Sequence, residues 1–398
     1  GGASIDDIDS EIQLYLQKHP FYDVCIANEG EVSLLQLVEY LMEHGKIEID
    51  SIIPGCCRLD PDGKLLKGIW TAPDLNKVPS PYLDGSLDEF LPTGHDPMLE
   101  TLRGCPYSCT FCVDGTLNYR KLRFFPIETV LAEIDYIKEH GTGEYWIFAD
   151  RNFGIAGERD VRIAEHVLSK IDRNSPPYRM KIVTAKIVTK HVKRVAETLS
   201  DINEMTMSLQ SMDEDVIKEI KRTNQKFDTF IENVKWAAEN NVISSTEMIF
   251  GMPGETCDSY IKGMEKLIRS GIERIYSYNL RLLDGSDLSV QSEREKYQFK
   301  TRFRLPDKDY GFYDGEPIFE MEEIPIECTS YNFNDFLRAR AYGFFLELAS
   351  GLGYFTELMK IMIRIGLPGE GLLLHLLNNY NKKNFLPAIF EDYFDRVK

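Results

Sequence analysis

The sequence predicts an α/β fold built on parallel strands, and three observations predict it. The chain has 398 residues, enough for two or more domains, and 43% of them are hydrophobic, which supports a substantial core. Between Met98 and Asp284, short apolar runs alternate with stretches of helical periodicity. Such alternation produces parallel βαβ units, and right-handed crossovers allow them to close into a complete or partial barrel.

The elements of this alternation follow one another in a regular order. A first strand begins at Met98, and Pro126 opens a helix that Gly141 ends. The later strands are expected at 144–150, 180–187, 204–210, 243–251 and 274–283. The later helices are expected at 160–171, at 190–199 after a Thr189 cap, from a Ser211–Glu214 capping box through Arg222, at 228–240 and at 257–270.

The segments outside the alternation differ in composition. Residues 22–44 read as a strand and an amphipathic helix, so residues 1–50 are expected to form the end of an α/β domain. Residues 51–97 are rich in Pro, Gly and Asp, which indicates a linker. After the 98–285 core, residues 286–398 are expected to form a mainly helical region whose first part, up to 330, is polar and irregular.

Charge and cysteine usage restrict the class of protein. The net charge of −18 argues against broad electrostatic capture of nucleic acid. No apolar run is long enough to span a membrane and no secretion signal is visible, so we expect a cytoplasmic protein. The first residue is Gly rather than Met, which suggests a piece of a longer chain. Eight cysteines, unevenly placed, favour metal binding over a disulfide framework.

Three of these cysteines form one short loop, TLRGCPYSCTFCVDG. Cys105, Cys109 and Cys112 are spaced C-x3-C-x2-C, and thiolates are soft ligands suited to zinc or iron–sulfur clusters. Three thiolates suit a [4Fe–4S] cluster in which the protein holds three irons and leaves the fourth open to another ligand. The alternative is a zinc site that borrows a distant Cys or His.

The stretch RGCPYSCTFC resembles the cluster loop of the radical S-adenosylmethionine (SAM) enzymes, including an aromatic, Phe111, before the last cysteine. The resemblance covers roughly 98–285 and implies a radical SAM (β/α)6 partial TIM-like barrel. It also implies two cofactors, a [4Fe–4S] cluster and SAM, which the cluster cleaves to a 5′-deoxyadenosyl radical. The partners it implies are a small-molecule substrate and an external electron donor such as flavodoxin or ferredoxin.

The resemblance also assigns SAM contacts to particular residues. Phe111 would lie near the adenine. Asp150, after the second strand, stands where the family contacts the methionine amino group, although the usual G-G-E stretch is absent. Ser208 and Gln210, at the end of the fourth strand, would hold the ribose or the methionine carboxylate.

A second group of carried-over residues follows the fourth and fifth strands. Arg222 would pair with the carboxylate, and Gly251 and Gly254 would let the backbone approach the adenine. Each has a simpler reading, since a cation is favourable at a helix end and two glycines beside Pro253 make a turn in any βα protein. No catalytic residue for the substrate is assigned.

The first fifty residues and the linker resemble those of one radical SAM subgroup, which carries a Rossmann-like cobalamin-binding domain before the barrel. That subgroup implies cobalamin as a further cofactor and methyl transfer to an unactivated carbon of a small-molecule or natural-product substrate. No D-x-H-x-x-G cobalamin signature is present in this sequence. The alternatives are a radical SAM enzyme that does not use cobalamin or does not methylate, a methylthiotransferase, and a non-catalytic iron–sulfur or zinc sensor.

Overall fold

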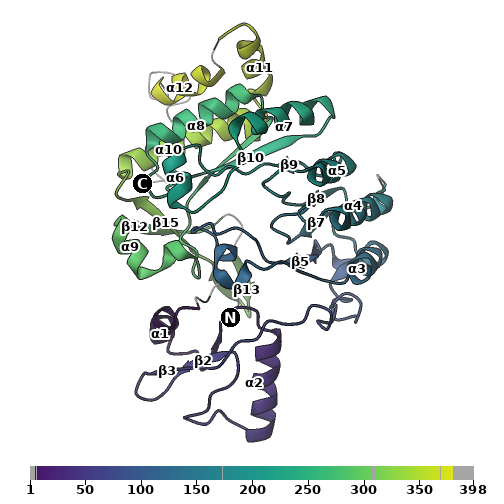
Figure 1. Cartoon of the computed structure of the whole chain (residues 1–398), viewed down its shortest axis with the longest axis vertical. Helices are drawn as coiled ribbons and strands as arrows, with labels where there is room; N and C mark the ends of the chain where they lie inside the picture. The colour runs from purple at the N-terminus through teal and green to yellow at the C-terminus, as the bar shows by residue number, and fades with distance from the viewer. Residues whose placement is uncertain (1–4, 6, 173, 307–309, 368, 380–398) are drawn as a thin grey trace.

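The protein was analysed as a computed structural model, which describes residues 5, 7–172, 174–306, 310–367 and 369–379 (Figure 1). Its centre is an arc of six parallel strands in two sheets. One sheet has the order β4 (Met98–Leu99), β7 (Tyr145–Phe148), β8 (Arg179–Lys181), and the other has β9 (Met205–Thr206), β10 (Ser244–Phe250), β11 (Arg274–Asn279). These are the six predicted strands, each shorter than the apolar run that predicted it.

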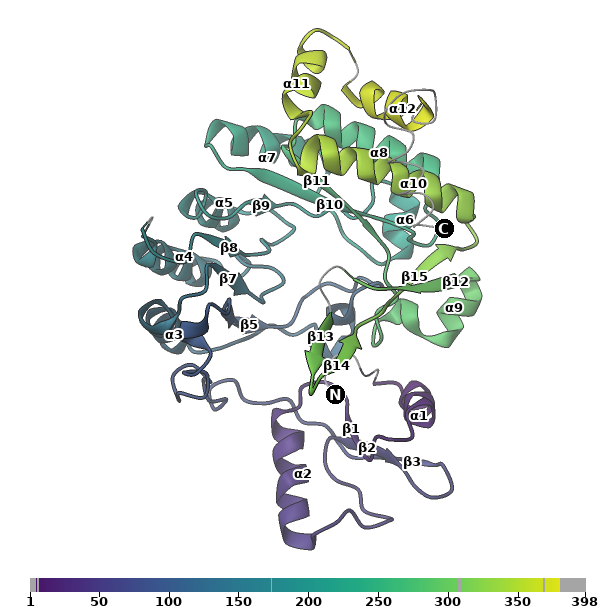
Figure 2. The ribbon, with the colours of Figure 1, turned by 180° about the vertical axis from the view of Figure 1, so that it is seen from behind.

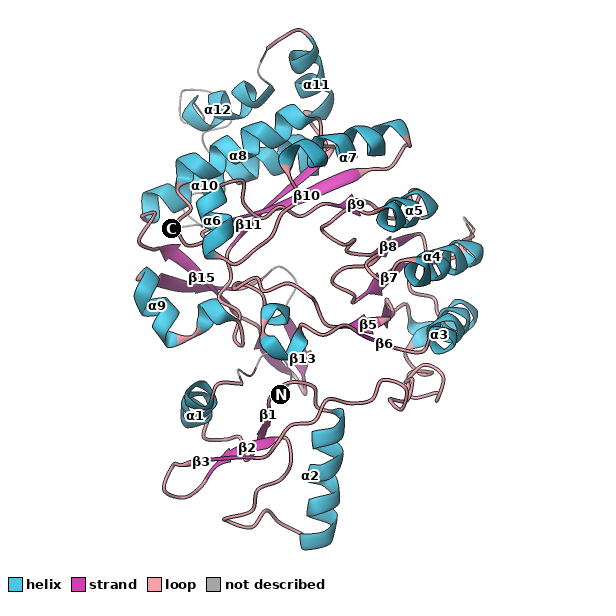
Figure 3. Ribbon diagram, in the orientation of Figure 1, coloured by secondary structure: helices cyan, strands magenta, loops and turns pink. Residues whose placement is uncertain are grey.

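A side-chain hydrogen bond joins the two sheets, because the hydroxyl of Thr184, after β8, donates to the carbonyl of Thr206 in β9 over 2.7 Å. Within the second sheet, the hydroxyl of Thr246 in β10 donates to the carbonyl of Met207, which follows β9, over 2.9 Å. Threonine suits such positions because its branched Cβ fits a strand while its hydroxyl satisfies a neighbouring carbonyl. The strands therefore continue as one arc, the partial barrel that the sequence predicts (Figure 3).

Helices cover the outer side of this arc. They are α3 (Ile127–His140), α4 (Glu158–Lys170), α5 (Lys190–Thr198), α6 (Glu214–Glu219), α7 (Phe227–Glu239) and α8 (Cys257–Ser270). Their apolar faces pack on the strands; Ile134, Trp146 and Val161 belong to one buried cluster. Burial of one such side chain contributes about 1.5–3 kcal/mol to the free energy of unfolding, so this packing holds the helices against the strands.

Of the two helix caps named in the sequence analysis, one is confirmed and the other is wrong. Thr189 caps α5 as predicted, because its hydroxyl accepts from Val192 N at 3.3 Å. The predicted Ser211–Glu214 capping box is wrong. Asp213 is the cap of α6, while the Ser211 hydroxyl donates to the buried carboxylate of Glu255. Ser211 is fully buried, so its hydroxyl is used in the core rather than at the helix terminus.

The N-terminal part packs as a small separate layer (Figure 1). It contains α1 (Asp9–Lys18), α2 (Glu31–His44) and an antiparallel sheet of β1 (Cys25–Ile26), β2 (Cys56–Leu59) and β3 (Leu65–Lys67). Two of these strands lie within 51–97, which the composition indicated to be a linker. The register of β1 and β2 places Cys25 opposite Cys57, and both cysteines are free.

Short elements connect this layer to the arc. The strands β5 (Leu102–Arg103) and β6 (Arg123–Phe124) pair antiparallel, and single 3-10 turns lie between the longer elements. The turns are η1 (Leu91–Thr93), η2 (Val113–Gly115), η3 (Leu117–Tyr119) and, after the arc, η4 (Asp287–Ser289). The cysteine loop lies between β5 and η2, and β5–β6 holds its base.

The expectation that residues 286–330 are irregular is wrong. After α9 (Gln291–Tyr297) come two antiparallel pairs, β12 (Lys300–Arg304) with β15 (Glu322–Glu327), and β13 (Tyr310–Tyr313) with β14 (Glu316–Phe319). The missed signal is Asp314–Gly315, a two-residue turn between aromatic runs whose φ angles are 50° and 84°. An Asp-Gly pair with positive φ at both positions is the turn that hairpins prefer.

Helices follow, as the sequence predicts. They are α10 (Phe333–Leu346), a π-helical turn η5 (Glu347–Gly351), α11 (Thr356–Arg364) and α12 (Gly369–Asn379); residues 380–398 lie outside the described residues. Seen from behind, α10 lies beside α8 over the second sheet (Figure 2). Among the helices described, none combines the length and apolarity needed to cross a membrane.

One carboxylate ties the N-terminal layer to the arc. Glu29, just before α2, pairs with Arg103 at 3.0 Å and with Arg123, and its side chain is only 9% exposed. Its own carbonyl accepts from the indole of Trp70 at 2.9 Å. Arg103 has two further carboxylate partners, at 2.6 and 2.9 Å. Loss of the Glu29 carboxylate would therefore mainly affect Arg123, which is largely buried and would lose the carboxylate it pairs with.

We therefore expect Glu29→Gln to lower the free energy of unfolding by about 2–3 kcal/mol. Chemical denaturation followed by tryptophan fluorescence measures this, with Trp70 beside the mutated residue as a local probe. The matched control is Glu48→Gln, which removes an exposed pair with Lys46 and is expected to cost less than about 0.5 kcal/mol. Equal effects of the two substitutions would contradict the role given to Glu29.

Candidate functional site

Backbone hydrogen bonds fix the shape of the cysteine loop. Cys105 N donates to the carbonyl of Tyr119 at 2.7 Å, and Cys112 N donates to that of Cys109 at 3.1 Å. Gly115 packs so closely on this loop that an added Cβ would lie 2.3 Å from the Cys109 carbonyl. The loop therefore closes on itself and presents its three thiols toward the carboxyl ends of the parallel strands.

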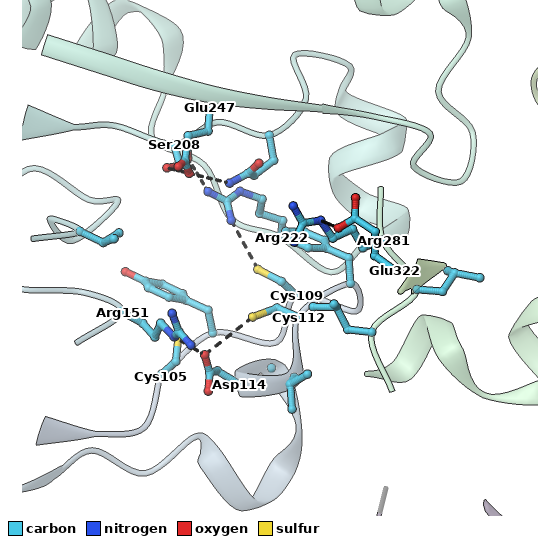
Figure 4. Close-up of a pocket in the computed structure, with 18 of the residues that line it drawn as sticks. Cys105, Cys109, Cys112, Asp114, Arg151, Ser208, Arg222, Glu247, Arg281 and Glu322 are labelled. Atoms are coloured by element: carbon cyan, nitrogen blue, oxygen red, sulfur yellow. Dashed lines mark hydrogen bonds and ion pairs between the residues drawn. The ribbon is translucent and has the colours of Figure 1, made fainter. Parts of the chain in front are cut away.

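The thiols line a cavity of about 990 Å³ inside the arc (Figure 4). Four other side chains predicted from the resemblance line it too: Phe111, Ser208, Gln210 and Arg222. They come from sequence positions far apart and meet because parallel strands end at the same edge. The structure thus gathers the cluster cysteines and these four predicted SAM contacts around one space. Their roles remain predictions.

Polar side chains approach two of the sulfurs. Arg222 Nη1 lies 3.6 Å from Cys109 Sγ, and its Nε donates to Asn224 Oδ1 at 2.8 Å. Asn152 Nδ2 lies 3.2 Å from Cys105 Sγ. Hydrogen bonds and positive charge beside a sulfur stabilise the thiolate and the clusters that thiolates hold. Asn152 was missed by the sequence analysis, although it stands two residues after Asp150.

A carboxylate that the sequence analysis also missed occupies another wall of the cavity. Glu247, within β10, accepts a hydrogen bond from the Ser208 hydroxyl at 2.6 Å and one from Gln210 Nε2 at 3.4 Å. Gln210 Oε1 is buried and has no hydrogen-bond partner among the described residues. These oxygens are acceptors for ammonium or hydroxyl groups. Glu247 alternates with apolar residues along its strand, as ordinary polar strand residues do. The sequence therefore gave no signal that marked Glu247 as a site residue.

Lys186 supplies a second cation beside Arg222. Its side chain is 8% exposed, and its ammonium has no hydrogen-bond partner among the described residues, lying instead 3.5 Å from the ring centroid of Tyr107. Burial, and then the charge of Arg222, lower the pKa of Lys186 to about 8, while the nearby thiols oppose this shift. An unpaired ammonium facing the cavity is arranged to receive an anionic group.

Burial favours the neutral form of two of the three thiols. Burial raises the pKa of Cys105 and raises that of Cys112 to about 12, where the neighbouring Asp114 acts in the same direction. Asp114 is in turn paired with Arg151 at 2.8 Å. A metal must therefore displace the thiol protons, and loading is expected to be favoured by higher pH.

Three residues predicted from the resemblance lie outside the residues that line the cavity. Asp150 is 1% exposed and accepts from Leu102 N at 2.7 Å and from the hydroxyl and N of Thr101, so it anchors the β4–β5 connection. Gly251 and Gly254 have φ angles of 105° and 84°, which glycine adopts without strain, and they form the turn after β10. A turn is the simpler reading given above for the two glycines, and the SAM contacts of all three residues remain predictions.

The donor set fits an iron–sulfur cluster. Three thiols on one loop border a large cavity, two of them contacted by Arg222 and Asn152. Among the described residues, no three His, Cys, Asp or Glu side chains converge closely enough to hold a single metal ion. Soft sulfur ligands spread around a space of this size, with cations beside it, match the requirements of a negatively charged [4Fe–4S] group.

Comparison with known proteins agrees with this chemistry. Residues 99–268 match the Radical SAM superfamily. TokK, a cobalamin-dependent radical SAM methyltransferase from Streptomyces tokunonensis, is 29% identical over 370 residues, covering 85% of this chain and 53% of that protein. A 2-(S-pantetheinyl)-carbapenam-3-carboxylate methyltransferase from Streptantibioticus cattleyicolor is 29% identical over 336 residues, covering 81% of this chain and 48% of that protein. The chain thus spans about half the length of these relatives.

A solved structure supports the fold. The cobalamin-dependent SAM radical enzyme OxsB, with aqua-cobalamin and SAM bound, superposes with a TM-score of 0.59 at 16% identity over 97% of this chain and 61% of that one. At such low identity the likeness concerns the fold alone. It agrees with the (β/α)6 arc.

Replacement of Lys186 tests the electrostatics of the cavity. In the metal-free protein Lys186→Met should raise the free energy of unfolding by about 1 kcal/mol at pH 7, since it removes a buried unpaired charge. The folded-state pKa of Lys186, about 8, lies below the ordinary 10.5. The penalty is therefore full below pH 8 and disappears as the pH approaches 10.5.

Thermal unfolding in the presence of a thiol reductant, at several pH values between 7 and 10, measures this difference. Lys190→Met, on the exposed start of α5, is the matched control and should show no pH-dependent gain. A Lys186→Met variant less stable than wild type at pH 7 would contradict an unpaired buried ammonium.

Proposed function

We propose that this chain, whose residues 99–268 match the radical SAM superfamily, reductively cleaves SAM at a [4Fe–4S] cluster. We further propose that it does so as the radical-generating part of a cobalamin-dependent methyltransferase. The methyl acceptor would be an unactivated carbon of a small-molecule or natural-product substrate. The observation that carries the proposal is the loop of Cys105, Cys109 and Cys112, which opens into a cavity bordered by Arg222 and Lys186.

The cysteines would hold three of the four irons. When bound, the cluster supplies the electron that cleaves the sulfonium bond of SAM to give methionine and a 5′-deoxyadenosyl radical. Arg222 is positioned for two tasks, because its guanidinium reaches Cys109 while the Ser208 carbonyl and Asn224 hold it in place. It stabilises charge on the sulfur and presents a donor to the methionine carboxylate.

Two further groups would orient SAM. Lys186 offers an unpaired ammonium to the carboxylate, and desolvation within the cavity strengthens such a pair. Glu247 offers a side-chain oxygen to the methionine ammonium or to the ribose hydroxyls of SAM. Ser208 and Gln210 hold the Glu247 carboxylate in place. Phe111, packed on the apolar cluster around Leu280, presents a ring to the adenine and excludes water from that side.

The methyl-transfer part of the proposal is supported by what the relatives are. Two proteins 29% identical to this chain are methyltransferases, one of them cobalamin-dependent and the other named for a carbapenam substrate. The sequence contains no D-x-H-x-x-G signature, so cobalamin would be held by other residues or by another part of a longer enzyme. The electron donor would be a flavodoxin or ferredoxin.

Removal of the cluster ligands tests the proposal. After anaerobic reconstitution with iron and sulfide, the wild-type chain should be brown and should convert SAM to 5′-deoxyadenosine when dithionite is added. The Cys105→Ala, Cys109→Ala, Cys112→Ala triple variant should bind no cluster and form no 5′-deoxyadenosine above background. Cys328→Ala is the matched control, because its thiol lies outside the residues lining the cavity, and it should behave like wild type.

The products separate the alternatives. S-adenosylhomocysteine together with 5′-deoxyadenosine, in the presence of cobalamin and an acceptor, supports the methyltransferase. 5′-Deoxyadenosine alone indicates another radical reaction. A reconstituted cluster whose spectrum does not respond to SAM indicates a sensor, and a colourless, zinc-loaded protein overturns the cluster itself.

A further inference from the structure

A second cavity continues from the first. It measures about 860 Å³ and shares with the first cavity the residues around Phe111, Cys112, Gln210 and Glu247. From there it extends past the end of β11 to the inner face of α10. A molecule in the second cavity would therefore have one end beside the cysteine loop and the other end against α10.

Arg340 stands at the far end of this second cavity. It lies on α10, one turn before Gly343 and Phe344, which also line the cavity. Its Nε is buried and has no hydrogen-bond partner among the described residues, and its guanidinium stacks 5.8 Å from the ring centroid of Phe336. A buried donor without an acceptor costs free energy unless a ligand satisfies it.

Two of the other cations around this cavity share a single carboxylate, whereas Arg151 pairs with Asp114 at 2.8 Å. Arg281 Nε lies 2.6 Å from a Glu322 oxygen, and Arg304 pairs with the other oxygen of the same carboxylate. One carboxylate thus serves two guanidiniums. Glu347 also lines this cavity, and burial raises the pKa of its carboxyl group.

We infer that the second cavity is the substrate subsite and that Arg340 binds an anionic group of the substrate, a carboxylate or a phosphate ester. This inference rests on the proposed function, which requires a substrate beside the cysteine loop. A planar guanidinium pairs with either anion through two parallel hydrogen bonds and so fixes orientation as well as position. The aromatic rings of Tyr276 and Tyr278, which also line the cavity, suit an apolar body between the anionic end and the reacting carbon.

Three probes of similar size test the charge preference: 2-naphthoate, 2-naphthyl phosphate and neutral 2-naphthol. Each is titrated into the purified 398-residue chain by calorimetry, without SAM. Both anions should bind about 10-fold or more tightly than 2-naphthol, and Arg340→Gln should remove most of that preference while leaving 2-naphthol binding unchanged. The order of affinity between the two anions identifies the carboxylate or the phosphate ester as the group recognised.

Arg338→Gln is the matched control. It removes the same charge from the same helix, but Arg338 points to Asp258 at 2.7 Å and lies outside both cavity linings. Arg340→Lys, which keeps the charge without the planar fork, should fall between wild type and Arg340→Gln, and a thermal melt establishes that each variant is folded.

Equal affinity of wild type for anions and 2-naphthol, or equal losses in the Arg340→Gln and Arg338→Gln variants, would overturn the inference. The titration involves no turnover. A chain that binds the anions through Arg340 but forms no 5′-deoxyadenosine would overturn the proposed function alone, and a chain that cleaves SAM without this preference would overturn the inference alone.

Discussion

The attachment of the cysteine loop to the second half of the arc is the contact on which the rest of the site depends. Thr110 N, in the middle of the loop, donates to the carbonyl of Ile220 at 3.1 Å, and Leu288 N donates to the carbonyl of Thr110 at 3.0 Å. These bonds join segments more than one hundred residues apart. Through them the first and last βα units enclose one space, and Arg222 is brought to Cys109.

Cations with unsatisfied donors are the second property of the site. The cavity walls carry both charges, since acids such as Glu247 line them together with Lys186, Arg222 and Arg340. The ammonium of Lys186 and the Nε of Arg340 have no hydrogen-bond partner among the described residues, and such a buried donor is costly unless an anion satisfies it. A negatively charged cluster, the carboxylate of SAM and an anionic substrate would each satisfy part of this requirement, so the proposed cofactors and the inferred substrate class are consistent with one another.

Local sequence signals predicted the regular part of the fold well. The helix α5 begins after its predicted Thr189 cap, α8 has the bounds that the sequence predicts, and the six strands follow in the expected order. The errors have physical causes. Ser211 is drawn into the core by Glu255 and cannot cap α6, and the hairpin at Asp314–Gly315 lies in a polar segment where the turn signal was overlooked. Asp150 is not among these errors: its carboxylate accepts from Thr101 and Leu102, and its SAM contact remains a prediction.

The sequence by itself determined the chemistry of the cysteine loop, because ligand type and spacing are local properties of Cys105, Cys109 and Cys112. It also determined the alternation of strands and helices, because hydrophobic periodicity is a local property too. Only the tertiary structure decided that Lys186, Glu247 and Arg340 face the same connected space. Each is an ordinary charged residue in its own segment, and its significance comes from burial and from missing or shared partners. Those depend on how distant segments pack, which no local pattern encodes.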